Sequence, residues 1–367
     1  MQVEEIQSKA VNFLRFPFMV GVVLLHNPVP LYFRSRDIHL DIFYDLFSSI
    51  IPVFIVPFFF FISGYFFFNK PGFGTKVYFE KIGKRAKTLL VPYVFWTAAW
   101  LVAYYLLYNS PLVGGFLGKG REYSVRYILE AFWCSLVPDA LRAPPGNPTI
   151  LPEIGQFWYL RDLMCVLIWS PVLHYFIKRI GVIFVIILGL AWLAGLRIPC
   201  LGDRGLSLLA LFFVSGGAWF GIKQKNFLSG FLTLRHSIFI LYPLSLAAAL
   251  LLLYCSDYGV FSIALRISIL CAIPFFVNFV ALLFEKKHLK DTPFLSSAAF
   301  LVFALHQPWI LLFFRKLFLK NTVTMSCGNG LFYYCLYPVL VIAICLPLHY
   351  LLRRFLPRLN NLLTGGR

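Results

Sequence analysis

The chain is short of charged residues, and acidic residues are the scarcest of them. Asp and Glu number only 15, and charged residues of both signs make up 13% of the 367 positions, which is about half the share found in soluble globular domains. This shortage excludes an ordinary water-soluble domain. Hydrophobic residues make up 60% of the chain instead and form repeated apolar runs long enough to cross a bilayer. The sequence therefore predicts an all-α fold, a polytopic bundle of transmembrane helices.

Cysteine spacing excludes two further classes of protein. None of the eight cysteines forms a Cys-x-x-Cys pair, and most lie in or beside apolar runs, so we expect neither a bound metal nor a disulfide framework. Lys and Arg, by contrast, number 33 and give a net charge of +18. They cluster in short loops between apolar runs, as membrane topology requires, so we expect a lipid bilayer as partner and no nucleic acid.

The apolar runs predict about ten membrane spans within a single domain, residues 1–367. An even number places both termini on one side, and with N-in and C-in topology the cytoplasmic segments hold 20 of the 33 basic residues, as the positive-inside rule requires. The longest connection, about 109–156, then lies on the outer side. The predicted spans are 13–32, 43–68, 88–108, 157–177, 180–197, 206–221, 234–254, 260–284, 295–317 and 331–355.

Two polar residues of the first span, Arg15 and His26, share one helix face. They are eleven residues apart, and eleven steps of ~100° end only ~20° beyond three full turns, ~16 Å along the axis. The stripe that joins them consists of Asn12, Arg15, Met19, Val22 and His26. Charged and titratable groups inside a span are costly and usually functional. Alternatively, His26 bonds a loop carbonyl at the helix end, and Arg15, close to Pro17, is a snorkelling cation in the first helical turn.

A second signal is the basic run before the third span. It contains Lys81, Lys84, Arg85 and Lys87. Lys84 and Lys87 are three residues apart, so a helix would bring them together as a clamp for a phosphorylated ligand. The alternative is that these residues only set the topology of the membrane protein.

Two segments combine polar with aromatic residues at the second and fourth spans. Ser63-Gly64 interrupts an aromatic run, a pattern that favours close helix packing, although a serine can also act as a nucleophile. Trp158 suits an aromatic belt at the membrane interface. The neighbouring Arg161 and Asp162 point to different faces of a helix and need not pair. We consider Ser63, Trp158 and Arg161 candidates for lining a substrate path.

His306 and Gln307 extend this candidate path in the ninth span. They lie in mid-span and are followed by Pro308, which removes a backbone hydrogen bond. Polar residues at a break of this kind usually face the bundle interior or a cavity. The alternative is a structural hydrogen bond between helices.

Together these motifs resemble the acyltransferase-3 family of bacterial integral membrane proteins. The resemblance rests on Arg-x10-His in the first span, on FFFISGYFF, on a basic run leading to LLVPY, on FWYLRDL and on LHQPW. It implies about ten helices in the bacterial cytoplasmic membrane, acyl-CoA as donor on the cytoplasmic side, an essential His26 and a functional Arg15. Where the family often has Arg-x-x-Arg, this chain has Lys84 and Lys87, which supply charge but not the planar fork of a guanidinium group.

The sequence therefore predicts an O-acyltransferase that uses acyl-CoA, with acetyl-CoA the family's usual donor, as co-substrate. Its acceptor is expected to be a hydroxyl group of an envelope or exported glycan or of a lipid-linked sugar, with His26 as general base. One alternative is a transporter or flippase of a lipid-linked saccharide. Another is a membrane scaffold in an envelope-assembly complex.

Overall fold

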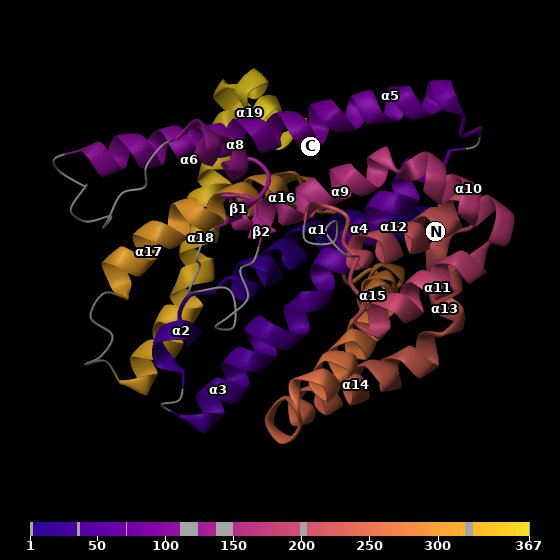
Figure 1. The fold of residues 1–367 in the computed structure, drawn as a ribbon. Coiled ribbons are helices and arrows are strands. Elements are labelled where there is room, and N and C mark those ends of the chain that lie inside the picture. The colour runs from indigo at the N-terminus through magenta and orange to yellow at the C-terminus, as the bar shows by residue number, and fades with distance from the viewer. Residues whose placement is uncertain are drawn as a thin grey trace.

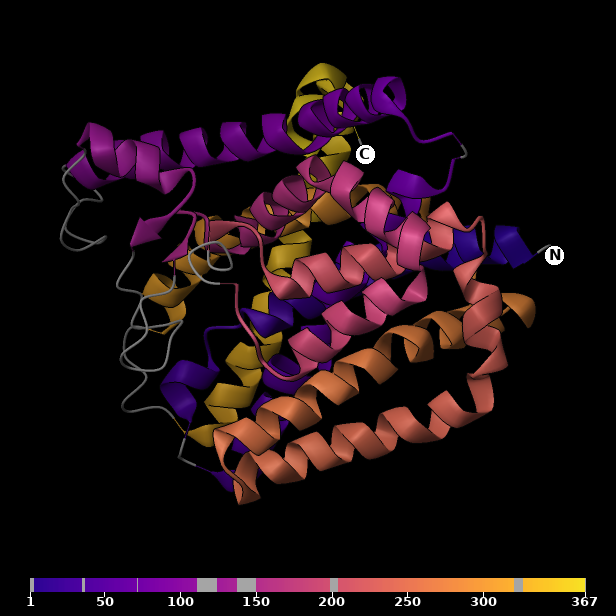
Figure 2. The same ribbon diagram turned by 45° about the vertical axis from the view of Figure 1, so that its right-hand side comes forward.

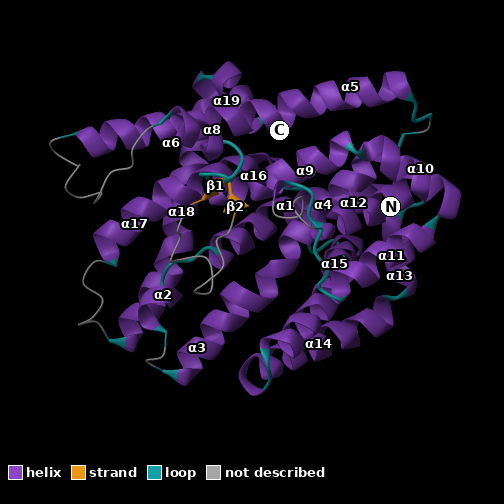
Figure 3. Ribbon diagram, viewed as in Figure 1, coloured by secondary structure: helices purple, strands orange, loops and turns teal. Residues whose placement is uncertain are grey.

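The fold is almost entirely helical. In a computed structural model the described residues are 3–34, 37–70, 72–110, 124–136, 150–198, 204–319 and 326–366. Figure 3 shows helices throughout and one small exception, in which β1 (Ser135–Leu136) pairs with β2 (Ile150–Leu151) in antiparallel register, Ser135 opposite Leu151. The predicted all-α class is confirmed, with this two-residue ribbon added.

All ten predicted spans contain helices, although not all of these helices are long. Within the described residues, seven helical stretches have the length and composition to cross a membrane. The segment Gly155–Ile168 continues into Ser170–Ile180 after a bend of 62°, and counting this pair as one span gives eight. Val182–Leu193 and Leu208–Ile222 are apolar but shorter. A multi-pass helical membrane protein is thereby supported, while ten complete spans with N-in, C-in topology stay a prediction.

Figure 1 labels the α-helices; the short π- and 3-10-helical turns between them, named η here, are not labelled. The elements before the long connection are α1 (Val3–Leu25), α2 (Pro30–Phe33), α3 (Ile38–Tyr44), η1 (Asp45–Ile50), η2 (Ile51–Phe54), α4 (Ile55–Phe68), α5 (Thr75–Arg85), η3 (Ala86–Leu90) and α6 (Val91–Asn109). Those that follow are α8 (Val125–Ala131), η4 (Gly155–Phe157), α9 (Trp158–Ile168), α10 (Ser170–Ile180), α11 (Val182–Leu193), α12 (Leu208–Ile222), α13 (Phe227–Thr233), α14 (Arg235–Cys255), α15 (Tyr258–Glu285), α16 (Pro293–Leu305), η6 (His306–Ile310), α17 (Leu311–Phe318), α18 (Cys327–Phe355) and α19 (Pro357–Thr364).

Helix α1 lies inside the bundle. It contacts α4, α15, α16 and α18, and apolar residues such as Ala10, Leu14 and Phe18 are buried in these contacts. In Figure 2, α14 and α15 run side by side along one flank, and α5 with α6 forms a long rod along the opposite flank. The polar stripe of α1 therefore faces other helices over much of its length, with Met19 and Val22 buried and Arg15 and His26 half-buried.

Small residues bring α4 and α12 together, as predicted for Ser63-Gly64. A methyl group on Gly64 would collide with the Val214 carbonyl, and one on Gly217 would collide with the Phe61 carbonyl. Backbones can approach this closely in a membrane only where side chains are absent. This contact fixes the rotation of α4, and Ser63, ~100° around the helix from Gly64, lies on a different face.

The described part of the long connection packs against the bundle. Helix α8 and β1 belong to this connection. The Tyr93 hydroxyl donates to the Phe132 carbonyl, and the Trp133 indole donates to the Arg204 carbonyl at 3.0 Å. These bonds attach the connection to α6 and to the segment before α12. Much of the loop, including the Pro-rich stretch 142–149, lies outside the described residues.

Candidate active site

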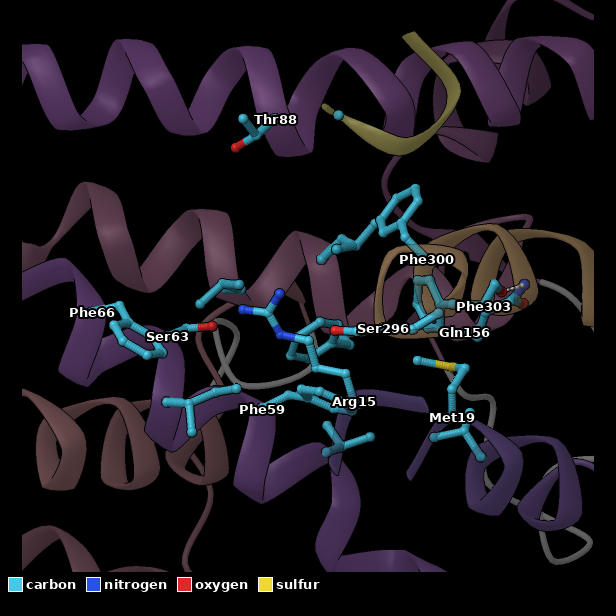
Figure 4. A pocket seen from close by; sticks show the side chains of 18 of the residues that line it. Arg15, Met19, Phe59, Ser63, Phe66, Thr88, Gln156, Ser296, Phe300 and Phe303 are labelled. Atoms are coloured by element: carbon cyan, nitrogen blue, oxygen red, sulfur yellow. Dashed lines mark hydrogen bonds between the residues drawn. The ribbon is translucent and has the colours of Figure 1, made fainter. Parts of the chain in front are cut away.

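A cavity of about 530 Å³ lies between α1, α4, α9 and α16, and part of it is shown in Figure 4. At the centre of that view Arg15 projects from α1 into the cavity, with Ser63 and Phe66 to one side and Met19 and Phe303 to the other. The full lining is Ser8, Asn12, Arg15, Met19, Val22, Leu25, His26, Val56, Phe59, Ile62, Ser63, Phe66, Arg85, Thr88, Gln156, Trp158, Tyr159, Leu160, Leu163, Ser296, Ala299, Phe300, Phe303, Gly365 and Gly366.

The α1 wall of the cavity is the stripe that the eleven-residue spacing predicts. Asn12, Arg15, Met19, Val22 and His26 all line it. Arg15 and His26 therefore open onto the same space at different positions along the helix, ~16 Å apart by helical rise. The cavity is long enough to hold an extended ligand between a cation and an imidazole.

One end of the cavity carries two arginines. Arg15 from α1 and Arg85 from the end of α5 both line it and are both half-buried. Their positive charges are near enough to interact, and Tyr159 lines the same cavity. Among the residues that the structure describes, no Asp or Glu lines this cavity. Partly buried cations without a carboxylate partner favour an anionic ligand.

The other end carries two histidines. His26 Nδ1 lies 3.0 Å from the Val22 carbonyl oxygen, one turn back in α1. His306 Nε2 lies 3.4 Å from the same His26 Nδ1, and His306 Nδ1 lies 3.1 Å from the Val302 carbonyl oxygen. His26 lines the cavity, and His306 stands directly behind it with none of its surface exposed.

The helix is interrupted directly after His306. Gln307 has extended backbone angles (φ −144°, ψ 134°) in the π-helical turn η6, so α16 and α17 are two separate helices, as Pro308 predicts. The Gln156 side-chain amide donates to the carbonyl oxygens of Phe303, at 3.2 Å, and of Gln307. The Tyr337 hydroxyl donates to the His306 carbonyl at 2.8 Å. Neighbouring side chains thus satisfy the carbonyls that the break leaves without helical partners.

The predicted site residues divide into two groups. Arg15, His26, Ser63, Arg85 and Trp158 line the cavity, although they come from four separate elements. The remaining six candidates do not line it. They are Lys81, Lys84, Lys87, Arg161, His306 and Gln307.

Only one of the four basic candidates before the third span reaches the cavity. Arg85 and Thr88 line it, one helical turn apart, whereas Lys84 and Lys87 are exposed on another face. The Lys81 amine donates to the Phe67 carbonyl and lies 5.4 Å from the centre of the Phe67 ring. The basic run is therefore split between the cavity and the surface, and a role for its lysines stays a prediction.

The expectation that Arg161 and Asp162 need not pair is wrong. Arg161 Nη2 and Asp162 Oδ1 are 3.0 Å apart, and both side chains are almost completely buried. Arg161 also donates to the Trp133 carbonyl at 2.9 Å. The flexible arginine side chain reaches around the first turn of α9, because an unpaired charge buried here would be far more costly than a paired one. The pair joins α9 to the long connection.

Several lining residues carried no recognisable signal in the sequence. Gly365 and Gly366 close the cavity beside Thr88, with φ of +68° and +70°. A methyl group on Gly365 would collide with the Thr88 carbonyl, and the Trp96 indole donates to the Leu363 carbonyl at 2.9 Å. A glycine pair after a helix usually indicates only a helix end. Its place here follows from tertiary packing of α19 against α6.

Comparison with known proteins agrees with this architecture. The sequence matches the acyltransferase domain of the acyltransferase-3 family over residues 8–350. The chain belongs to the acyltransferase-3 family. The match includes His26, directly after α1, and His306, directly after α16, so the predicted resemblance is confirmed and the protein is a membrane acyltransferase.

One curated relative of this acyltransferase spans nearly its whole length. The succinoglycan biosynthesis protein ExoH of Rhizobium meliloti (strain 1021) is 27% identical over 371 residues, which cover 98% of this chain and 92% of ExoH. No solved structure gives a significant match.

Proposed function

We propose that this protein is an O-acyltransferase of the bacterial cytoplasmic membrane. It transfers an acyl group, acetyl in the simplest case, from cytoplasmic acyl-CoA to a hydroxyl group of an envelope or exported polysaccharide. The observation that carries the proposal is the single cavity that joins an arginine pair to a histidine. The polysaccharide acceptor is suggested by the similarity to ExoH, a succinoglycan biosynthesis protein.

The arginine end suits the donor. Acyl-CoA carries phosphate groups at one end of a pantetheine arm and the thioester at the other. Arg15 and Arg85 can form charge-assisted hydrogen bonds to phosphate, and a guanidinium fork binds two oxygens at once. The ~16 Å from Arg15 to His26 is of the order of an extended pantetheine arm. Phosphates held at the arginines would therefore bring the thioester toward the histidine.

The histidine end suits the chemistry. His26 Nδ1 faces the Val22 carbonyl, which can only accept a hydrogen bond, so the proton of the neutral ring lies on Nδ1 and the lone pair on Nε2. As general base, Nε2 takes the proton of the acceptor hydroxyl while the oxygen attacks the thioester carbon. The carbon–sulfur bond then breaks, and the imidazolium returns the proton to the CoA thiolate. The products are the acyl ester and free CoA.

Transfer by purified protein tests this proposal. The protein is reconstituted in liposomes with acetyl-CoA carrying a labelled acetyl group and with the cell's own envelope polysaccharide, and the polysaccharide is analysed by mass spectrometry. We expect labelled ester on the polysaccharide with wild-type protein and none with His26→Ala. Full activity of the variant would overturn the role of His26. Saccharide binding without any gain in mass would favour the transporter alternative.

A further inference from the structure

We infer that His306 is a positioning residue that holds His26 in its basic tautomer and stabilises the imidazolium formed during transfer. The inference rests on the proposed role of His26 as general base. It is carried by the juxtaposition of two rings from α1 and from the break after α16, 280 positions apart in the chain, with 3.4 Å between His306 Nε2 and His26 Nδ1.

Both rings have the same tautomer for independent reasons. Val22 and Val302 each present a carbonyl oxygen to the Nδ1 of the histidine four residues later, at 3.0 and 3.1 Å. A carbonyl only accepts, so each neutral ring carries its proton on Nδ1. His306 Nε2 then holds a lone pair, and it faces a His26 N–H. The His26 Nδ1–H therefore donates both to the Val22 carbonyl oxygen and to His306 Nε2.

The surroundings prevent His306 from leaving this arrangement. Its side chain is fully buried, and the Tyr337 hydroxyl holds its carbonyl at 2.8 Å. The Phe303 ring lies 6.3 Å away, centre to centre, on one side of the imidazole. A group that is locked by packing and hydrogen bonds can orient a catalytic side chain at no further entropic cost during the reaction.

The contact also matters after proton transfer. When His26 Nε2 accepts the hydroxyl proton, positive charge spreads over the ring and strengthens the Nδ1–H donor. The His306 lone pair and the Val22 carbonyl then lie against this developing charge on the side of the ring that faces the fully buried His306, where such interactions are stronger than in water. His306 therefore takes the orienting place that a carboxylate holds in a hydrolase triad, without adding a buried negative charge.

Substitution of His306 by Leu and by Gln tests the inference. Leu removes the acceptor, and we expect kcat to fall up to about 100-fold, as misplacement of a catalytic group does, while KM for acetyl-CoA stays within about 3-fold because the arginine end is intact. Gln offers an amide oxygen near the position of Nε2 and should restore a large part of kcat. His349→Leu is the matched control, since this buried histidine of α18 bonds Ser297 away from the cavity.

A spectroscopic measurement separates this inference from the proposed function. With 15N-labelled histidine in wild-type protein, the His26 signal, assigned by its loss in His26→Gln, should report a protonated Nδ1 and an unprotonated Nε2. In His306→Leu we expect a mixture of the two tautomers. An unchanged His26 signal together with wild-type kcat in His306→Leu would overturn the positioning role, even if His26→Ala is inactive. Full activity of His26→Ala would instead overturn the proposed function, whatever the tautomer.

Discussion

The two ends of the cavity differ in the charge of their side chains and in how those side chains are hydrogen-bonded. At the arginine end, Arg15 and Arg85 bring two positive charges together with a tyrosine and no acidic lining residue within the described structure. At the histidine end, His26 and His306 are matched to each other and to carbonyls. The first end is incomplete without an anion, whereas the second is already ordered. The proposed function divides donor binding and chemistry between these two ends, and each expected outcome below tests that division.

The largest effect is expected at the histidine end. His26→Gln keeps a polar side chain but removes the base, so kcat should fall about 1,000-fold, within the range for loss of a general base. Steady-state kinetics in proteoliposomes measure this. KM for acetyl-CoA should stay within about 3-fold of wild type, because the proposed function places the donor's phosphates at the arginine end. A large rise in KM with little change in kcat would place His26 in donor binding instead.

At the arginine end we expect substitutions to change KM rather than kcat. Arg15→Ala and Arg85→Ala should each raise KM for acetyl-CoA about 10- to 100-fold, which corresponds to the 1.5–3 kcal/mol of a charged hydrogen bond. Lys at either position should recover part of this, since it keeps the charge but not the fork. Arg179→Ala, on an exposed turn of α10, is the matched control and should leave KM unchanged. An equal rise in KM in all three alanine variants would show that only the net charge of the protein matters.

The glycine turn that closes the arginine end should affect donor entry more weakly. Gly366 lines the cavity, and no neighbouring atom lies within 4 Å of a Cβ built on it, so a large side chain has room there. We expect Gly366→Trp to reduce kcat/KM for acetyl-CoA about 10-fold, allowing for strain at a positive φ. Gly72→Trp is matched, because Gly72 also has a positive φ and open space but does not line the cavity. Similar losses of kcat/KM in both variants would show that the effect comes from backbone strain alone.

The smallest effect is expected outside the cavity. Lys84 and Lys87 are exposed, and exposed charges in water contribute little to binding, typically below about 1 kcal/mol. The double variant Lys84→Gln, Lys87→Gln should therefore raise KM for acetyl-CoA less than about 5-fold. The same kinetics at low and high salt would detect a weak surface contribution. A rise in KM as large as that of Arg85→Ala would instead support the phosphate clamp that the sequence predicts for these lysines.

Periodicity predicted one wall of the site well, because a helix converts spacing into a face. It placed Arg15 and His26 on one stripe, and Pro308 located the break in the ninth span. Spacing within one segment does not encode how helices pack. It therefore could not predict that His26 contacts His306, or that Arg85 lines the cavity while its lysine neighbours do not. The pairing of Arg161 with Asp162 was missed because the geometry of adjacent Cβ atoms ignores side-chain reach and the cost of burying charge.

Equilibrium binding of acetyl-CoA to two variants, one altered at each end, tests the division most directly. Titration calorimetry compares wild-type protein with His26→Gln and with the double variant Arg15→Ala, Arg85→Ala, all in the same detergent. We expect His26→Gln to bind acetyl-CoA as wild type does and the double variant to show no binding. Loss of binding in His26→Gln, or wild-type affinity in the double variant, would contradict the division of the cavity into a donor end and a catalytic end.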